Sequence, residues 1–331
     1  MEEEKKLYPF RFCTLEDECN WGRMRFGLAD LGYRDSLVRD GWLAGNSIGE
    51  VMDMYMDRVV GENVFEYWGR QFPVCVRTLE VRGRMPLQVC PSDETAAQRY
   101  DLLGKEKLWY VARAGRKAGI AIGFRKATDA SEVYSRCADG SIDGILNYIA
   151  PHQGQILRIP AGTVHAAEGD LEIVEIAESS PLDFCLCAWG QALTEDEFDP
   201  TLGIVDALDF IDYAPFKSVP ASGIPQFCVE LIRLKDALRV KGGNPESFTL
   251  YSCVSGGASV QLEVLGQTAS FPLKSGETVL VPAECPDFLV VPNVAETVVL
   301  ETTVPYRSEK DGYINPDVPA ALPEDSDLTS C

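Results

Sequence analysis

The sequence predicts an all-β protein with two sandwich or barrel domains and a few short helices. Short apolar runs with strand-like patterning recur along most of the 331 residues. The 20 prolines and 28 glycines are spread along the chain, as expected where turns separate many short strands. A sequence motif in the first half also recurs, altered, in the second half. A chain of this length can bury two hydrophobic cores.

The first half contains the strands and helices of one predicted domain. Strands are predicted over residues 72–90, 107–124, 154–160 and 171–189. Helices are predicted over residues 93–103, 129–138 and 195–212. The first begins at the Ser92 cap with Asp93 and Glu94 in its first turn, and the second begins at Asp129 or Ser131. The third is amphipathic and acidic.

The second half returns to strand patterning after a proline-rich linker. Residues 214–225 contain three prolines and separate the two predicted domains. Strand-like runs then follow over 226–304: FCVELIRL, SFTLYSCV, SVQLEVL, ETVLVP, FLVVP and TVVLETTV. We therefore predict domains at 1–215 and 216–306. Residues 307–331 form an acidic, Pro-rich tail that buries too little apolar surface to offset its ordering entropy.

The charge of the chain excludes several classes of partner. The formal net charge is −21, which repels nucleic acid and acidic membrane surfaces. A sugar phosphate would also be repelled, so a phosphate site needs a local basic pocket. The start MEEEKKLYPF is not a signal peptide, and no stretch is long enough to span a membrane. Eleven cysteines without a CxxC pair indicate mostly reduced thiols in a cytoplasmic protein. The oligomeric state is left open.

The repeated motif contains a candidate site residue in its first copy. GQILRIPAGTVH at 154–165 has the spacing Gly, five residues, Pro-x-Gly, two residues, His. GETVLVPAECPD at 276–287 keeps the first Gly and the Pro but has Glu284 and Asp287 in place of Gly162 and His165. This spacing resembles the second sequence motif of the cupins, which are jelly-roll barrels whose histidine points inward and binds a divalent metal. The resemblance implies two cupin domains, with the site only in the first.

Several further motifs sharpen the resemblance. YPFRF, LAGNSIGE, FPVCVRTLE, LQVCPSDE, GKEKLWYV, IPAGTVHA and EIAESS occur in this order up to residue 180. Together they resemble the class I, zinc-dependent mannose-6-phosphate isomerases in their short bacterial form. The resemblance extends to about residue 305 and implies aldose–ketose isomerisation in carbohydrate metabolism.

The family's zinc ligands carry over only in part. In the family, a Gln and a His come from Q-x-H-P, a Glu from G-K-x-E-[LM]-W-Y and a second His from P-A-G-x-x-H. Here Gln88 and His165 match, Cys90 replaces the first His, and Lys107 replaces the Glu. A catalytic Arg of the family falls at Cys185 when the EIAESS block is aligned without a gap.

These substitutions leave open three functional interpretations and one purely structural alternative. In the first, the metal is lost and Lys107 supplies the positive charge, with Lys105 and Arg77 helping Gln88 to bind an anionic sugar. In the second, Gln88, Cys90, His165 and Cys185 form a rebuilt zinc site. In the third, Lys107 holds Cys90 as a thiolate. The alternative is that Cys90 and Cys185 merely fill a collapsed pocket.

An ammonium in place of a carboxylate has donors but no lone pair, so loss of the metal is the leading interpretation. Catalytic roles then fall to Lys107 and His165. The sequence thus predicts a sugar or sugar-phosphate binder with weak or no isomerase activity and no cofactor. The alternatives are an active isomerase with a rearranged zinc site and a non-enzymatic regulatory or scaffold protein.

Overall fold

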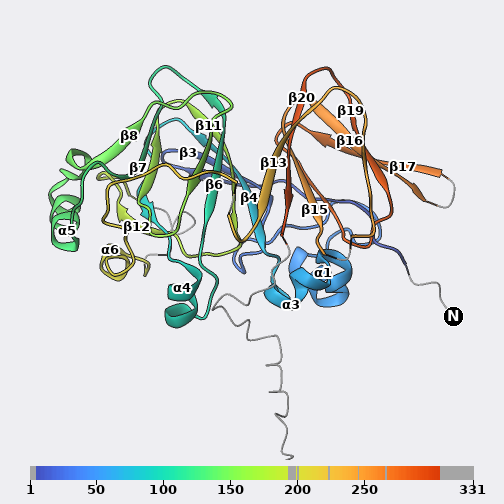
Figure 1. Ribbon diagram of the computed structural model, residues 1–331, viewed down its shortest axis with the longest axis horizontal. Coiled ribbons are helices and arrows are strands. Elements are labelled where there is room, and N and C mark those ends of the chain that lie inside the picture. The colour runs from blue at the N-terminus through green and yellow to red at the C-terminus, as the bar shows by residue number, and fades with distance from the viewer. Residues whose placement is uncertain are drawn as a thin grey trace, which may run out of the picture.

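The structure is a computed structural model that describes residues 5–192, 199, 201–222, 224–244, 246–264 and 267–305. The predicted tail at 307–331, and part of the predicted helix at 195–212, lie outside these residues. Two β-sandwiches stand side by side, and several short helices lie along their lower ends in Figure 1. The prediction of a mostly β protein with few helices is confirmed.

The first sandwich consists of a six-stranded and a five-stranded sheet with antiparallel neighbours. The six-stranded sheet has the order β2 (Leu15–Cys19), β3 (Gly22–Leu28), β4 (Val74–Val81), β11 (Leu171–Glu178), β6 (Lys107–Ala114), β9 (Ile156–Ile159). The five-stranded sheet has the order β12 (Phe184–Cys187), β5 (Leu87–Val89), β10 (His165–Glu168), β7 (Gly119–Phe124), β8 (Leu146–Ile149). Each predicted strand region of the first half therefore contains at least one strand.

The second sandwich pairs a five-stranded with a four-stranded sheet. The five-stranded sheet has the order β1 (Phe10–Arg11), β18 (Thr278–Val281), β15 (Thr249–Ser255), β20 (Thr297–Thr303), β13 (Cys228–Leu234). The four-stranded sheet has the order β14 (Leu238–Val240), β19 (Phe288–Pro292), β16 (Gly257–Val264), β17 (Gln267–Lys274). Because β1 pairs with β18, the start of the chain belongs to the later sandwich. The division into domains at 1–215 and 216–306 remains a prediction. The pairing of β1 with β18 joins residues from both sides of that boundary.

Two of the three predicted helices form as expected. Helix α4 (Asp93–Tyr100) begins at Ser92, whose side chain accepts a hydrogen bond from the Thr95 N–H. Helix α5 (Ala130–Asp139) begins at Asp129, which caps it in the same way. The prediction of a helix over 195–212 was too long. In the described part of that range only α6 (Ile204–Ala207) is helical, because the Asp212 N–H donates to the carbonyl oxygen of Gly162 instead of continuing a helix.

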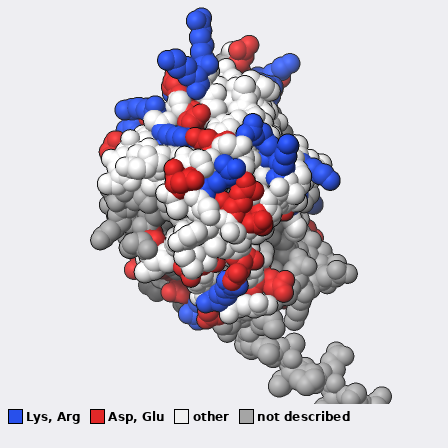
Figure 2. Space-filling view, turned by 90° about the vertical axis from the view of Figure 1, so that its left-hand side faces the viewer, with Lys and Arg blue, Asp and Glu red and all other residues white. Residues whose placement is uncertain are grey.

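The remaining helices were not predicted. They are α1 (Ile48–Tyr55), α2 (Asp57–Val60), α3 (Glu62–Trp68) and the 3-10 turn η1 (Ile142–Gly144). The start of α1 carries a recognisable signal, since Ser47 and Glu50 form a capping box. The longest helix in the described residues, α5, has 10 residues, so none of these helices spans a membrane. On the face that carries α5 and β8, basic and acidic side chains are interspersed (Figure 2), as in the ion pair of Arg136 with Glu132.

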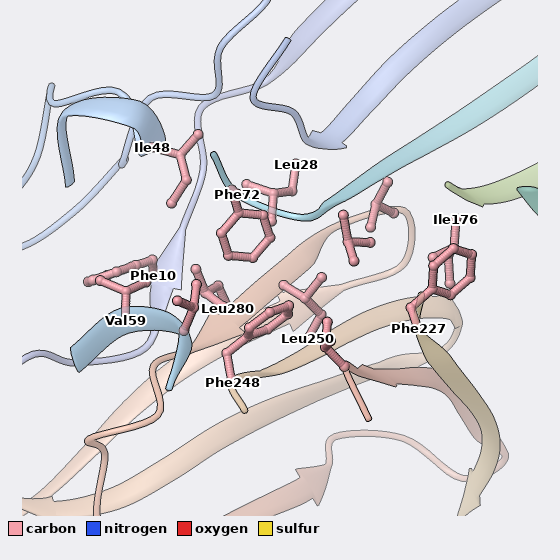
Figure 3. Packing of buried hydrophobic residues seen from close by; sticks show 14 of the residues in the cluster. Phe10, Leu28, Ile48, Val59, Phe72, Ile176, Phe227, Phe248, Leu250 and Leu280 are labelled. Carbon is pink, nitrogen blue, oxygen red and sulfur yellow. The ribbon is translucent and has the colours of Figure 1, made fainter. Parts of the chain in front are cut away.

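A shared hydrophobic core joins the two sandwiches. Phe72, before β4, and Phe248, before β15, pack with ring centroids 4.7 Å apart. Leu28 and Ile176 of the first sandwich lie in the same cluster as Leu280 of the second (Figure 3). Separate apolar clusters fill the interior of each sandwich. The first interior therefore has rigid walls, and polar side chains that point into it are held firmly.

Candidate functional site

Polar side chains enter the first sandwich from the six-stranded sheet in two neighbouring rows. Strand register places Glu175 on β11 directly opposite Arg77 on β4 and Trp109 on β6. The next row along the strands contains Cys75 and Lys107, both opposite the same residue of β11. Period-two alternation points these rows to one face of the sheet. That face is the interior, because Cys75 and Trp109 belong to its apolar cluster.

The facing sheet supplies the other half of the site. His165 begins β10 and lies opposite Gln88 on β5. Gly162 makes the turn before His165 with a φ of 80°. Cys90 follows the end of β5, and Asp183 immediately precedes β12. The structure thus brings Gln88, Cys90, Lys107 and His165 to one interior region, where the sequence motifs had predicted a site.

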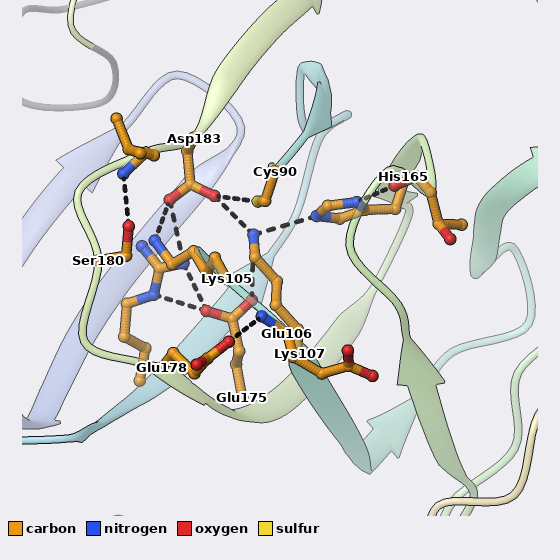
Figure 4. Close-up of polar contacts among 12 residues, drawn as sticks. Cys90, Lys105, Glu106, Lys107, His165, Glu175, Glu178, Ser180 and Asp183 are labelled. Atoms are coloured by element: carbon orange, nitrogen blue, oxygen red, sulfur yellow. Dashed lines mark hydrogen bonds and ion pairs between the residues drawn. The ribbon is translucent and has the colours of Figure 1, made fainter. Parts of the chain in front are cut away.

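The ammonium of Lys107 lies at the centre of this region (Figure 4). Its Nζ atom is 2.6 Å from Asp183 Oδ1 and 3.1 Å from His165 Nε2. Glu175 Oε2 is 3.8 Å from the same nitrogen. The lysine is completely buried. Two acceptors at hydrogen-bond distance and one carboxylate at ion-pair distance therefore surround the ammonium.

Asp183 and Glu175 join the remaining charged groups into one network. Lys105 Nζ is 2.6 Å from Asp183 Oδ2, and the Cys90 thiol donates to Asp183 Oδ1 over 3.1 Å. The guanidinium of Arg77 binds Glu175 and lies 3.6 Å from Asp183 Oδ2. The indole N–H of Trp109 donates to Glu175 Oε2 over 2.8 Å. We call Arg77, Lys105, Lys107, Glu175 and Asp183 the interior ion cluster.

His165 is a neutral imidazole that accepts from Lys107. Its Nδ1 lies 2.9 Å from the carbonyl oxygen of Thr163, which can only accept, so Nδ1 carries the proton and Nε2 presents its lone pair. Burial, and then the charge of Lys107, lower the pKa of His165 to about 3. Burial alone would lower the pKa of Lys107, but Asp183 and the neighbouring acidic groups outweigh burial and raise it. The lysine is therefore charged.

The two carboxylates of the cluster are ionised, and the cysteine is not. Burial would raise the pKa of Glu175, but Arg77 and Lys107 hold it at about 2. Lys105, Lys107 and Arg77 likewise overcome burial and hold the pKa of Asp183 well below its usual range. Burial raises the pKa of Cys90 to about 12, which keeps it a thiol. The structure therefore does not show the lysine–thiolate pair considered from the sequence.

The donor set does not fit a zinc ion. An ammonium replaces the expected carboxylate ligand, and it engages the Nε2 atom of His165 that a metal would need. Among the residues with described positions, no group of three His, Cys, Asp or Glu side chains could hold a metal ion. Lys107 thus supplies a positive charge at the centre of the network.

Of the other three predicted site residues, two belong to the cluster and one, Cys185, does not. Lys105 and Arg77 join the interior ion cluster. Cys185 is half-buried on β12 as the register partner of Gln88, and the acidic group of that segment that enters the cluster is Asp183. Sequence reasoning missed Asp183, two positions before Cys185, and Glu175, at the start of the EIAESS motif. Their signal was weak, because a carboxylate next to a strand is most often exposed to solvent.

The space left beside the cluster is small. A cavity of about 20 Å³ is lined by Trp21, Met24, Arg77, Leu79, Met85, Pro86, Gln88 and Asp183. Such a volume holds about one water molecule. Larger hollows lie elsewhere, such as one of about 510 Å³ beside β16 and β19 that includes Arg239 and Asp287. The interior site in this conformation is therefore closed to a sugar.

Comparisons with known proteins agree with the fold and the motifs. No family model matches the chain. The chain is 28% identical over 150 residues to the probable mannose-6-phosphate isomerase GmuF of Bacillus subtilis, and the match spans 45% of each protein. It is 23% identical over 279 residues to the putative mannose-6-phosphate isomerase YvyI of the same organism, covering 77% of this chain and 81% of YvyI.

A solved structure shows the same architecture. The crystal structure of the mannose 6-phosphate isomerase from Bacillus subtilis matches with a TM-score of 0.74 and 20% sequence identity, over 90% of this chain and 99% of that one. The predicted cupin fold is thereby confirmed.

Proposed function

We propose that this chain, a distant member of the type I mannose-6-phosphate isomerase family, is a metal-free homologue that has lost the isomerase reaction and retains a role in binding a sugar or sugar phosphate. The family assignment is the premise. Loss of the reaction is inferred from the chemistry of the interior site, and the ligand class is inferred from the names of the relatives. We place this role in the cytoplasm.

One observation carries the proposal. The ammonium of Lys107 binds His165 Nε2 and Asp183 Oδ1, and it lies near Glu175. A divalent cation would have to displace a buried lysine that forms two hydrogen bonds and an ion pair with Glu175. Removing that lysine's ion pairs is costly, since a charge left unpaired in the interior destabilises a protein by about 3–5 kcal/mol.

The same groups are poorly suited to the proton transfer of an aldose–ketose isomerisation. That reaction needs a base to move a proton between C1 and C2 and a positive group to stabilise the enediolate oxygen. His165 has a pKa of about 3, and its free nitrogen is occupied by Lys107. Glu175 and Asp183 have lowered pKa values as well, so they are weak bases. Efficient bases have pKa values near the working pH.

The interior ion cluster supports binding of an anion better than it supports catalysis. Arg77, Lys105 and Lys107 provide three positive charges against the two of Glu175 and Asp183. This local excess is what an acidic chain needs to attract a phosphorylated sugar. The small cavity implies that a sugar would enter only after the walls move apart. The closed cavity also favours a second candidate function, a non-enzymatic scaffold with a filled site.

Two assays separate these functions. The first measures interconversion of mannose 6-phosphate and fructose 6-phosphate with added Zn²⁺; we expect no turnover, and a rate like that of an active family member would refute the proposal. The second follows the unfolding temperature with mannose 6-phosphate, fructose 6-phosphate and unphosphorylated mannose. Stabilisation by the sugars supports binding, because a ligand that binds only the folded state raises its stability. No response to any sugar supports the scaffold function.

A further inference from the structure

A small cavity adjoins the interior ion cluster and has polar groups on one side. Its volume is about 20 Å³, enough for one water-sized particle. Trp21, Met24 and Leu79 form apolar parts of its wall, while Arg77, Gln88 and Asp183 form the polar part. In this closed conformation, a cavity of this size excludes sugars, phosphate and organic acids.

The side chain of Gln88 faces this cavity without a protein partner. Gln88 is only 4% exposed. Within the part of the chain that the structure describes, its amide makes no hydrogen bond. Buried amide groups are seldom left unpaired, because an unmade hydrogen bond costs about 1–3 kcal/mol. Its NH₂ group is therefore available to a small acceptor in the cavity.

Arg77 offers further donors at the same place. Its Nε and Nη2 atoms bind Glu175. Its Nη1 atom makes one hydrogen bond among the described residues, to the Met24 sulfur at 3.6 Å. A thioether is a weak acceptor. The guanidinium thus keeps donor capacity on the side where Met24 and Gln88 line the cavity.

The interior ion cluster also carries one uncompensated positive charge. Three cationic side chains face two carboxylates, and the neighbouring His165 and Cys90 are neutral. Both oxygens of Asp183 are already contacted by cationic groups, so its charge does not dominate the cavity. A buried unpaired charge is unfavourable, and a bound counter-ion would remove that penalty.

We infer that the cavity between Arg77 and Gln88 binds a single halide ion, with chloride as the natural occupant. The Gln88 amide and Arg77 Nη1 donate to the ion, and the apolar wall limits its size. Occupancy makes the cluster electrically neutral. The inference rests on the metal-free cluster of the proposed function, since a divalent cation there would change the charge count.

The test compares halides with a large anion at constant ionic strength. The protein is exchanged into sodium gluconate, chloride is titrated in, and the unfolding midpoint is recorded. We expect the midpoint to rise with the logarithm of the chloride concentration, and bromide to act similarly. Crystals grown with bromide should show one anomalous peak beside Arg77 and Gln88. Equal midpoints in chloride and gluconate, with no bromide peak, would overturn the inference.

A matched pair of variants locates the effect. Gln88→Met keeps the length of the side chain but removes its donors, and it should abolish the chloride-dependent rise. Gln261→Met makes the same change on β16 of the second sandwich and should keep the rise. A chloride response that persists in the Gln88 variant would contradict the assigned site. If that variant does not fold, the bromide peak of the unaltered protein still decides.

Elemental analysis of the same samples keeps the two proposals apart. Stoichiometric zinc would refute the metal-free function. Zinc-free protein that shows no halide response would refute only the halide site.

Discussion

At the scale of single residues, the charge at position 107 organises the site. A carboxylate at position 107 would attract a divalent cation, whereas the ammonium of Lys107 repels it. The ammonium instead forms hydrogen bonds with His165 and Asp183. Asp183 then serves as the partner of Lys107 and also of Lys105. The consequence is a self-contained network of ion pairs, which is the basis for proposing a metal-free site.

The first prediction removes the central ammonium. Lys107→Met keeps the length of the side chain but removes the buried positive charge that pairs with Asp183 and Glu175. We expect the free energy of unfolding in urea to fall by about 3–5 kcal/mol. Lys117→Met, at an exposed position, should change it by less than about 0.5 kcal/mol. Equal effects of the two changes would show that the interior network contributes no stability.

The second prediction concerns Glu178, whose carboxyl lies beside Glu106 and accepts from the Glu106 N–H over 2.8 Å. Burial, and then the charge of Asp93, raise its pKa well above the usual value. The folded state thus holds a proton that the unfolded state releases above about pH 4.3, so stability falls as pH rises from there towards the folded pKa.

Glu178→Gln removes this proton release. Relative to the unaltered protein, the variant should gain up to about 1.4 kcal/mol per pH unit above the unfolded pKa. Urea unfolding at pH 5.5 and pH 7.5 measures the gain, and Glu246→Gln at an exposed position serves as the control. A difference between variant and parent that does not change with pH would contradict the raised pKa.

The residues of the site were only partly predictable. The resemblance to the isomerase motifs predicted that Gln88, Cys90, Lys107 and His165 lie together, because these positions match the family's zinc ligands. Asp183 could not, because its role depends on the approach of Lys105 and Lys107 from another sheet. Long-range pairing of this kind leaves no periodic pattern in the sequence.

At the scale of elements, a glycine turn positions the imidazole. The repeated motif begins with Gly154 in one copy and Gly276 in the other, with φ values of 81° and 80°. Strands β9 and β18 follow these turns. Only the first copy continues through Gly162 to His165. The alternating strands and the caps of α4 and α5 were readable from sequence. Helices α1 to α3 were missed because single residues separate them, so none of them gives a long periodic pattern.

The third prediction tests the turn before His165. A Cβ atom at Gly162 would lie 2.7 Å from the carbonyl oxygen of Phe210, and φ is positive. Gly162→Ala should therefore lower the free energy of unfolding by about 1–3 kcal/mol. Gly154→Ala has a similar φ but no atom within 4 Å of its Cβ, so it should cost only the backbone strain, about 1 kcal/mol. Equal losses would mean that the contact with Phe210 does not matter.

At the scale of the whole molecule, the two sandwiches share one core. Strand β1 runs from the start of the chain into the later sandwich, and Phe72 packs on Phe248 across the boundary. The sequence indicated two similar units. It did not indicate that the start of the chain joins the later sandwich, since β1 is only two residues long. The polar groups thus lie inside the first sandwich, and the second sandwich packs against its outer face through the shared core.

The fourth prediction tests this shared core. Phe248→Ala should lower the free energy of unfolding by about 3–5 kcal/mol, because it opens a cavity between the sandwiches. Val205→Ala, at a side chain that is 66% exposed, should have little effect. Calorimetry of the Phe248 variant should still show one transition, since loss of the core weakens both sandwiches. Two separated transitions would show that the sandwiches unfold independently.

The zinc content of the purified chain tests the central claim most directly, namely that the Lys107 ammonium stands in place of a metal ion. The protein is equilibrated with excess Zn²⁺ at neutral pH, freed of unbound metal and analysed for zinc per chain. We predict that no stoichiometric zinc remains, because Lys107 holds His165 and Asp183. One tightly held zinc ion per chain, lost on Gln88→Met or His165→Ala substitution, would contradict the account.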